Sequence, residues 1–217
     1  MSPPRDGATW LGALAATVLT TGVTCQFLQH TDPTPPLLYF TVDSAVLAAA
    51  VQIRRLVHGP GSGPWDERLR GSAVVGVVLS SLVYLTVIAP SSPSGGWFGT
   101  HDDVWARTAT LLLHGAAPVL VVAEFLVSPC RPAPAHLAPA RHEAALLAWW
   151  PGAYLAVVGT LAWSGAATMP YLFLSPSRFG TGPVIATIAA LFATVLALAA
   201  ALTAAHRRLA RPPGAHA

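Results

Sequence analysis

The amino-acid sequence predicts an all-α integral membrane protein built as a bundle of six transmembrane helices. Of its 217 residues, 53% are hydrophobic and 10% are charged, whereas about 25% of the residues of a soluble domain are charged. Apolar windows long enough to cross a bilayer, which takes about 20 residues, recur along the chain. Their approximate bounds are 8–28, 37–57, 72–90, 107–128, 144–166 and 183–206.

The first window is longer than the hydrophobic region of a signal peptide. We therefore expect it to be retained as a helix, and an uncleaved signal anchor is the alternative. Breaks that contain proline, glycine or charged residues separate the later windows, and the sixth is an Ala/Leu-rich run that ends at His206. We expect one transmembrane domain over residues 1–207 and a short disordered tail over residues 208–217.

The distribution of arginine predicts the orientation. All twelve basic residues are arginines. With the N-terminus in the cytoplasm, ten of them fall in the inner segments, and only Arg107 and Arg178 fall in the outer ones. Because cytoplasmic loops carry the excess of basic residues, the sequence predicts a multi-pass protein of the cell membrane with both termini in the cytoplasm.

Several function classes lack a motif in this chain. The net charge of +3 is modest and the arginines lie in loops, so we expect no nucleic-acid partner. The motifs of serine hydrolases, zinc proteases, thiol redox proteins and phosphate-binding loops are missing, and we expect neither a metal nor a cofactor. Cys25 and Cys130 fall near opposite membrane faces in the predicted topology, which argues against a disulfide.

One histidine lies inside an apolar window. An imidazole is costly in lipid, so His114 is expected to have a partner, a ligand or a reaction; the alternative is a hydrogen-bonded structural histidine. Pro118 follows four residues later and has no N–H to donate to the carbonyl of His114. The backbone is therefore loosened at the turn that carries the ring.

Polar side chains from three predicted helices share the outer leaflet. At 1.5 Å per residue, Thr41 lies about 6 Å, Tyr84 about 9 Å and His114 about 10 Å from the outer edge, and Asp43 lies in the same layer. Each also has a structural interpretation. Thr41 can bond a preceding carbonyl, and Tyr84 can be an interfacial aromatic. Near the inner end, Glu124 is expected to pair with a basic loop residue or to be solvated.

Helical geometry separates Thr41 from Asp43. Residues two apart lie about 200° apart around the axis, so Thr41 shares a face with Ser44, and Asp43 faces elsewhere. A linear Thr–His–Asp triad is therefore not expected, and Asp43 is expected to orient another helix or to line a wet cavity. A Thr–His pair can still act, because a neutral imidazole can take the proton of a threonine hydroxyl and make it a nucleophile. Tyr84 or a free N–H near a helix break are candidate donors to an oxyanion.

Four short motifs occur in an order that resembles a known family. They are Tyr39-Phe-Thr41-Val-Asp-Ser44, Leu113-His114-Gly-Ala-Ala-Pro118, Trp150-Pro-Gly-Ala-Tyr154 and Met169-Pro-Tyr-Leu-Phe-Leu174. Their order and spacing are similar to those of the androgen-induced gene/androgen-dependent TFPI-regulating protein family and its bacterial relatives, which are six-span membrane proteins. The resemblance covers most of the chain.

The resemblance implies an intramembrane threonine hydrolase that acts on lipid esters of the fatty acid ester of hydroxy fatty acid type. It implies Thr41 as nucleophile and His114 as its partner. The bacterial pattern Tyr-Pro-Tyr-Pro-Phe-Leu-Asp differs here, where Met169-Pro-Tyr-Leu172-Phe-Leu-Ser175 lacks the second proline and the acid. We expect this difference to affect the outer loop and the choice of substrate rather than the Thr–His pair.

The leading functional hypothesis is therefore a threonine-dependent lipid ester hydrolase, with Thr41 and His114 as catalytic residues. Auxiliary or cavity-lining candidates are Asp43, Ser44, Tyr84 and Pro118. The alternative is a small lipid-binding or transport protein that uses the same polar cavity, and a third option is a scaffold in which the polar groups only join helices. The expected partner is a membrane lipid or lipid ester, and the sequence does not indicate the oligomeric state.

Overall fold

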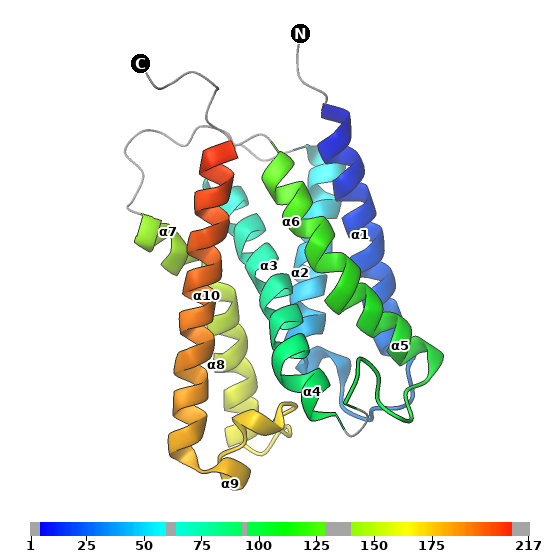
Figure 1. Cartoon of the computed structure of the whole chain (residues 1–217), viewed down its shortest axis with the longest axis vertical. Coiled ribbons are helices and arrows are strands. Elements are labelled where there is room, and N and C mark those ends of the chain that lie inside the picture. The colour runs from blue at the N-terminus through cyan, green and yellow to red at the C-terminus, as the bar shows by residue number, and fades with distance from the viewer. Residues whose placement is uncertain (1–4, 60–63, 93–94, 129–139, 210–217) are drawn as a thin grey trace.

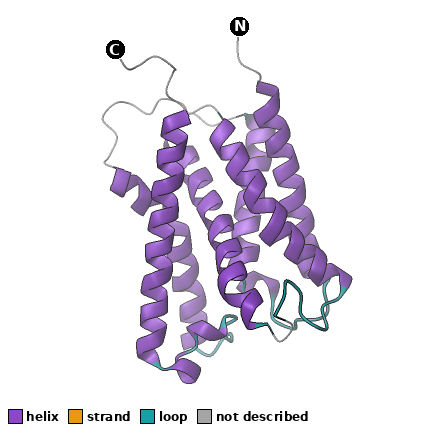
Figure 2. Cartoon of the chain, viewed as in Figure 1, coloured by secondary structure: helices purple, strands orange, loops and turns teal. Residues whose placement is uncertain are grey.

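The computed structural model describes residues 5–59, 64–92, 95–128 and 140–209, and every regular element in these ranges is helical (Figure 2). The helices form six rods that pack side by side (Figure 1). The rods are α1 (Arg5–Leu28), α2 (Phe40–His58), α3–η2–α4 (Pro64–Val83, Tyr84–Ile88, Ala89–Ser91), α5–η3–α6 (Val104–Thr110, Leu111–Ala116, Ala117–Val127), α7–α8 (Ala140–Leu147, Trp149–Trp163) and α10 (Thr181–Leu209).

Four of these rods are long and apolar enough to cross a membrane, as a membrane protein requires. They cover Gly7–Leu28, Trp65–Ser91, Val104–Val127 and Thr181–Leu209. The rods at the other two predicted windows do not meet both requirements of length and apolar character, for different reasons. Helix α2 carries Asp43, Arg54 and Arg55 within its 19 residues. The predicted window 144–166 falls on two helices of 8 and 15 residues, each shorter than the roughly 20 residues of a spanning helix.

The rods alternate in direction, so α1 begins and α10 ends at the same end of the bundle (Figure 1). We call this the terminal end, and the opposite end, which carries the segments 29–39, 95–103 and 164–180, the loop end. Helix α10 continues through Leu209, two residues beyond the predicted domain boundary. The remainder of the predicted tail, residues 210–217, and Cys130 lie outside the described residues, while Cys25 is buried with a free thiol.

Helix α3 lies between two apolar clusters and belongs to both. Val74 and Val77 pack with Leu19 and Val121 in the first cluster, which joins α1, α2, α3 and α6. Val75 and other α3 residues pack with α7, α8 and α10 in the second cluster. Because one helix joins both clusters, the bundle is held as a unit around α3.

Prolines interrupt the hydrogen bonding of two rods, and serines of α3 bind the carbonyls that they leave free. Pro118 cannot donate to the carbonyl of His114, and that carbonyl accepts from the Ser81 hydroxyl at 2.5 Å. Pro151 likewise leaves the carbonyl of Leu147 free, and this carbonyl accepts from the Ser72 hydroxyl at 2.8 Å. Backbone groups freed by proline in membrane helices are commonly satisfied in this way.

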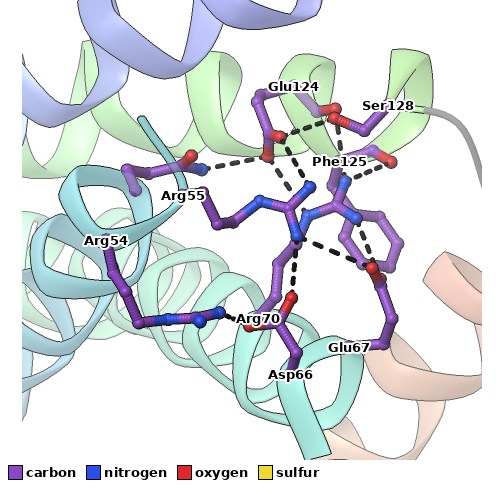
Figure 3. A network of polar contacts seen from close by, with 9 residues as sticks. Arg54, Arg55, Asp66, Glu67, Arg70, Glu124, Phe125 and Ser128 are labelled. Carbon is purple, nitrogen blue, oxygen red and sulfur yellow. Dashed lines mark hydrogen bonds and ion pairs between the residues drawn. The ribbon is translucent and has the colours of Figure 1, made fainter. Parts of the chain in front are cut away.

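The terminal end contains a buried ion network (Figure 3). Glu124, which is 3% exposed, accepts from Gln52 at 2.9 Å, from Arg70 at 3.3 Å and from Ser128 at 2.6 Å. Arg70 also pairs with Glu67 at 2.9 Å and donates to the carbonyl of Phe125 at 2.9 Å. The predicted pairing of Glu124 with a basic residue is confirmed, although Arg70 lies in helix α3 rather than in a loop.

Arginines of α2 extend the same network. Arg55 pairs with Asp66 at 3.1 Å and with Glu67 at 3.6 Å, and it lies 4.0 Å from Glu124. Arg54 pairs with Asp66. Three arginines therefore face three acids across α2, α3 and α6, and the charges of the network balance.

Candidate functional site

A cavity of about 340 Å³ opens at the loop end of the bundle. It is lined by side chains from α1, α2, η2, α4, α5, η3 and the segments 29–39 and 164–180. The lining residues are Gln26, Asp32, Tyr39, Thr41, Val42, Tyr84, Ile88, Ser91, Ala109, Thr110, Leu113, His114, Pro170, Tyr171, Leu172 and Phe173. Thr41, Tyr84 and His114 thus lie in the wall of one cavity, together with polar groups from the loop end.

His114 lies in a π-helical segment, η3, which spans Leu111–Ala116. Such segments occur frequently at functional sites because the wider turn changes the direction of its side chains. The His114 side chain is 9% exposed, and its Nδ1 atom is buried without a hydrogen-bond partner. An unpaired buried nitrogen is costly, and no structural hydrogen bond to Nδ1 compensates for its burial.

Tyr84 covers one face of this imidazole. The two rings are stacked with centroids 4.0 Å apart and planes inclined by 9°. Tyr84 begins the other π-helical segment of the described bundle, η2, which spans Tyr84–Ile88, and its hydroxyl donates to the carbonyl of Trp97. The loop that follows α4 therefore holds Tyr84 in place, and Tyr84 holds the orientation of the His114 ring.

Thr41 lies in the first turn of α2. The helix begins at Phe40, because Pro36 starts a separate 3-10 turn, η1 (Pro36–Leu38), so the predicted start at residue 37 is wrong by three residues. Backbone N–H groups of a first helical turn have no partner within the helix, and they carry the positive end of its dipole. The Thr41 hydroxyl therefore lies beside a positive backbone terminus.

Tyr171 contacts the same turn from the segment between α8 and α10. Its hydroxyl accepts from the N–H of Phe40 at 3.0 Å and lies close enough to Thr41 for that residue to lower the pKa of the phenol. Burial raises the pKa of Tyr171 to about 12, and hydrogen bonds from Phe40 and Thr41 offset part of the rise. Tyr171 is therefore protonated at neutral pH, and its O–H can donate toward a bound molecule.

A second, narrower cavity of about 70 Å³ lies on the other side of Thr41. The residues common to both cavities are Thr41, Ile88, Tyr171 and Phe173. His114 and Tyr84 line only the wider cavity. Thr41 and Tyr171 therefore stand at the junction, and His114 is reached from one side only.

The auxiliary candidates are placed differently. Ser44 is fully buried and its hydroxyl accepts from the Trp150 indole N–H at 3.0 Å, so it joins α2 to α8. Asp43 is partly exposed and lines neither described cavity. Pro118 also lines neither, and it acts on the site through the carbonyl of His114. Of the four auxiliary candidates, Tyr84 alone lines a described cavity.

Sequence reasoning assigned no role to the tyrosines around Thr41. Tyr39 donates to Asp32, and Tyr154 donates to the carbonyl of Leu38 at 2.6 Å, so both hold the start of α2. Tyr171 contacts Thr41 itself. All three belong to the quoted motifs, and the occurrence of a tyrosine in three of the four motifs was the available signal.

The described residues contain no group of three or more His, Cys, Asp or Glu side chains that could hold a metal ion. Comparison of the chain with protein-family models, with curated proteins and with solved structures gave no match.

Proposed function

We propose that this protein is an intramembrane hydrolase of lipid esters, with Thr41 as nucleophile and His114 as general base and then general acid. The observation that carries the proposal is that both side chains line one cavity. The order of the four motifs supports membership of the androgen-induced gene/androgen-dependent TFPI-regulating protein family, and with it an ester of the fatty acid ester of hydroxy fatty acid type as substrate.

The proposed reaction has two steps. His114 takes the proton of the Thr41 hydroxyl while the Thr41 oxygen bonds to the ester carbonyl carbon. The bond from that carbon to the alcohol oxygen then breaks, and His114 returns the proton to the departing alcohol. Water, activated by His114, hydrolyses the acyl–Thr41 ester, which releases the carboxylic acid and restores both residues.

Donors near Thr41 suit the negative charge that develops on the carbonyl oxygen. The first turn of α2, at the positive end of the helix dipole, and the Tyr171 hydroxyl both lie near Thr41. Removing one preorganised donor of this kind slows hydrolases by about 10² to 10³. The Tyr171 O–H is preferred as oxyanion donor over the Tyr84 hydroxyl, which donates to the carbonyl of Trp97, and over the Phe40 N–H, which donates to Tyr171.

We also propose that all six rods cross the cell membrane, with the terminal end in the cytoplasm. Ten of the twelve arginines fall in segments that the sequence predicts to be cytoplasmic, and the ion network provides partners for Arg54, Arg55 and Arg70. This orientation brings the cavity to the outer leaflet, where lipid esters can enter.

The first test is covalent labelling. The purified protein is treated with a small fluorophosphonate, and wild type is compared with Thr41→Ala and His114→Ala. We expect labelling of the wild type, none in Thr41→Ala, and a rate lower by roughly 10² or more in His114→Ala, because the hydroxyl is a poor nucleophile without its base.

Thr108→Ala is the matched control, since Thr108 lines neither described cavity and its hydroxyl donates to the carbonyl of Val104 at 2.7 Å; it should label like wild type. Labelling that persists in Thr41→Ala would exclude this threonine as nucleophile. No labelling in any variant, with lipid still bound, would favour the lipid-binding or transport alternative.

A further inference from the structure

The narrow cavity beside Thr41 has an almost wholly apolar wall. It lies between α2, α3, α8, α10 and the segment before α9 (Pro176–Phe179). Aliphatic and aromatic side chains from these elements make the wall, among them Leu79, Val83, Leu155, Ile188 and Phe192.

The polar groups of this wall are engaged, except at the junction with the wide cavity. The Ser80 hydroxyl donates to the carbonyl of Val77 at 2.9 Å, and the Tyr154 hydroxyl donates to the carbonyl of Leu38 at 2.6 Å. Thr41 and Tyr171 lie at the junction itself. A ligand group in the narrow cavity therefore contacts hydrocarbon side chains. Transfer of apolar surface from water into such surroundings has a favourable free energy of about 25 cal/mol per Å².

The location of His114 determines which cavity holds the alcohol half of an ester and which holds the acyl half. In the proposed reaction His114 returns a proton to the departing alcohol, so the alcohol oxygen must lie on the side that His114 can reach. His114 lines the wide cavity and not the narrow one. The acyl half must then extend from Thr41 in the other direction.

We propose that the narrow cavity is the acyl-chain site, which takes an unbranched aliphatic chain, and that the wide cavity holds the alcohol half of the ester. This inference rests on the proposed hydrolase function. The wide cavity offers Gln26, Asp32, Tyr39 and Thr110 as polar neighbours, so it suits an alcohol half that itself carries polar groups. The narrow cavity suits only hydrocarbon, because its wall is apolar away from the junction.

Val195 provides the test. It lies on α10, is 1% exposed and lines the narrow cavity, and a phenylalanine in its place would fill part of the space. We expect Val195→Phe to lower kcat/KM for p-nitrophenyl palmitate by about tenfold or more. Hydrolysis of p-nitrophenyl acetate and labelling by the small fluorophosphonate should stay close to wild type, which also shows that the variant is folded.

Leu196→Phe is the matched control, because Leu196 is the next residue of α10, is 42% exposed and is not part of the cavity wall. It should leave both activities unchanged. An equal fall for the acetate and the palmitate esters in Val195→Phe would overturn the acyl-chain site, since the loss would then not depend on the chain.

A binding measurement separates this inference from the hydrolase proposal. Palmitic acid with a terminal diazirine is photolysed with the protein in phosphatidylcholine vesicles, and the cross-linked residues are identified by mass spectrometry. We expect cross-links at Leu155 and Phe192 in both wild type and Thr41→Ala, and their loss in Val195→Phe. That result without any hydrolysis would reject the hydrolase and keep the chain site, whereas cross-links confined to exposed positions such as Leu196 would reject the chain site.

Discussion

At the scale of single residues, the site depends on contacts that fix two side chains from opposite sides. The stacked ring of Tyr84 orients His114, while Tyr171 holds the first turn of α2 through Phe40 and Thr41. Neither tyrosine acts as the general base of the proposed reaction. Their effect is to fix geometry, which matters because the rate of a positioned nucleophile and base falls steeply with small displacements.

Tyr171→Phe should lower kcat for a lipid ester by roughly tenfold to a hundredfold, with a smaller change in KM. The variant keeps the ring packing on Tyr39 and Phe173 but removes the hydroxyl beside Thr41, whose donation we expect to strengthen as charge develops. Steady-state kinetics that separate kcat from KM measure the effect.

Tyr39→Phe is the comparison for that experiment. It removes a hydroxyl from the same cavity, but this hydroxyl donates to Asp32 rather than toward Thr41. A loss of kcat as large as that of Tyr171→Phe would mean that the two tyrosines act only by stabilising the loop end.

At the scale of the helices, proline and serine act as pairs. Pro118 and Pro151 each free a carbonyl four residues earlier, and Ser81 and Ser72 of α3 satisfy these two carbonyls. The pairs connect α3 to α5–η3–α6 and to α7–α8. The carbonyl bound by Ser81 belongs to His114, so one of these structural pairs also holds the backbone of the candidate base.

Ser81→Ala should destabilise the protein by about 1–3 kcal/mol, because it leaves a buried carbonyl without a partner. In a Pro118→Ala background the same substitution should cost less, since the alanine introduced there can donate its backbone N–H to that carbonyl. Thermal unfolding of the four proteins in this double-mutant cycle gives the interaction energy, expected at about 0.5–3 kcal/mol.

The second pair, Ser72 and Pro151, tests whether the interaction energy is specific to Ser81 and Pro118. Ser72→Ala should destabilise wild type and the Pro118→Ala variant equally, because its partner carbonyl belongs to Leu147. An interaction energy near zero between Ser81 and Pro118 would contradict the pairing.

At the scale of the whole molecule, the two ends of the bundle have opposite character. The loop end holds the two cavities, while the terminal end is filled by the ion network of α2, α3 and α6 (Figure 3). Arg70 is 1% exposed and contacts Glu124, Glu67 and Phe125. A charged network in the interior of the terminal end favours a cavity reached from the loop end over a path through the bundle.

Arg70→Met should destabilise the protein by about 3–5 kcal/mol, because it leaves the buried carboxylate of Glu124 short of charge compensation. Arg70→Met combined with Glu124→Gln should recover part of this loss. Thermal unfolding in detergent is the measurement, and Arg178→Met, at an exposed position, is the control. A double variant no more stable than Arg70→Met would contradict the charge argument.

The proposed six-span topology predicts which ends of the bundle a reagent can reach. In a background of Cys25→Ala and Cys130→Ala, Ser177→Cys at the loop end should react with a membrane-impermeant maleimide in intact cells. Arg207→Cys at the terminal end should react only after the membrane is opened. Both positions are exposed, so labelling of residue 207 in intact cells would reverse or reject the proposed orientation.

Local chemistry made much of the fold predictable. Runs of apolar residues indicated the helices, and the four stretches that are long and apolar enough to span a membrane overlap four of the predicted windows, although the stretch predicted from residue 72 already begins at Trp65. Pro118 indicated a loosened turn at His114, and this turn is a π-helical segment. The 37–57 window begins three residues before helix α2, because Pro36 starts a separate turn, and the 144–166 window falls on two helices that meet at Ala148, near Pro151.

The sequence by itself determined an all-helical, apolar chain, a polar pair near one depth and a helical phase that separates Asp43 from Thr41. These follow from hydrophobicity, proline chemistry and the 3.6-residue period, which act over a few turns. Only the tertiary structure decided that Tyr171 would meet the helix start 131 residues away and that His114 would line one cavity and not the other. Which rods become neighbours, and how each is rotated, depends on side-chain packing between rods, and no local pattern specifies it.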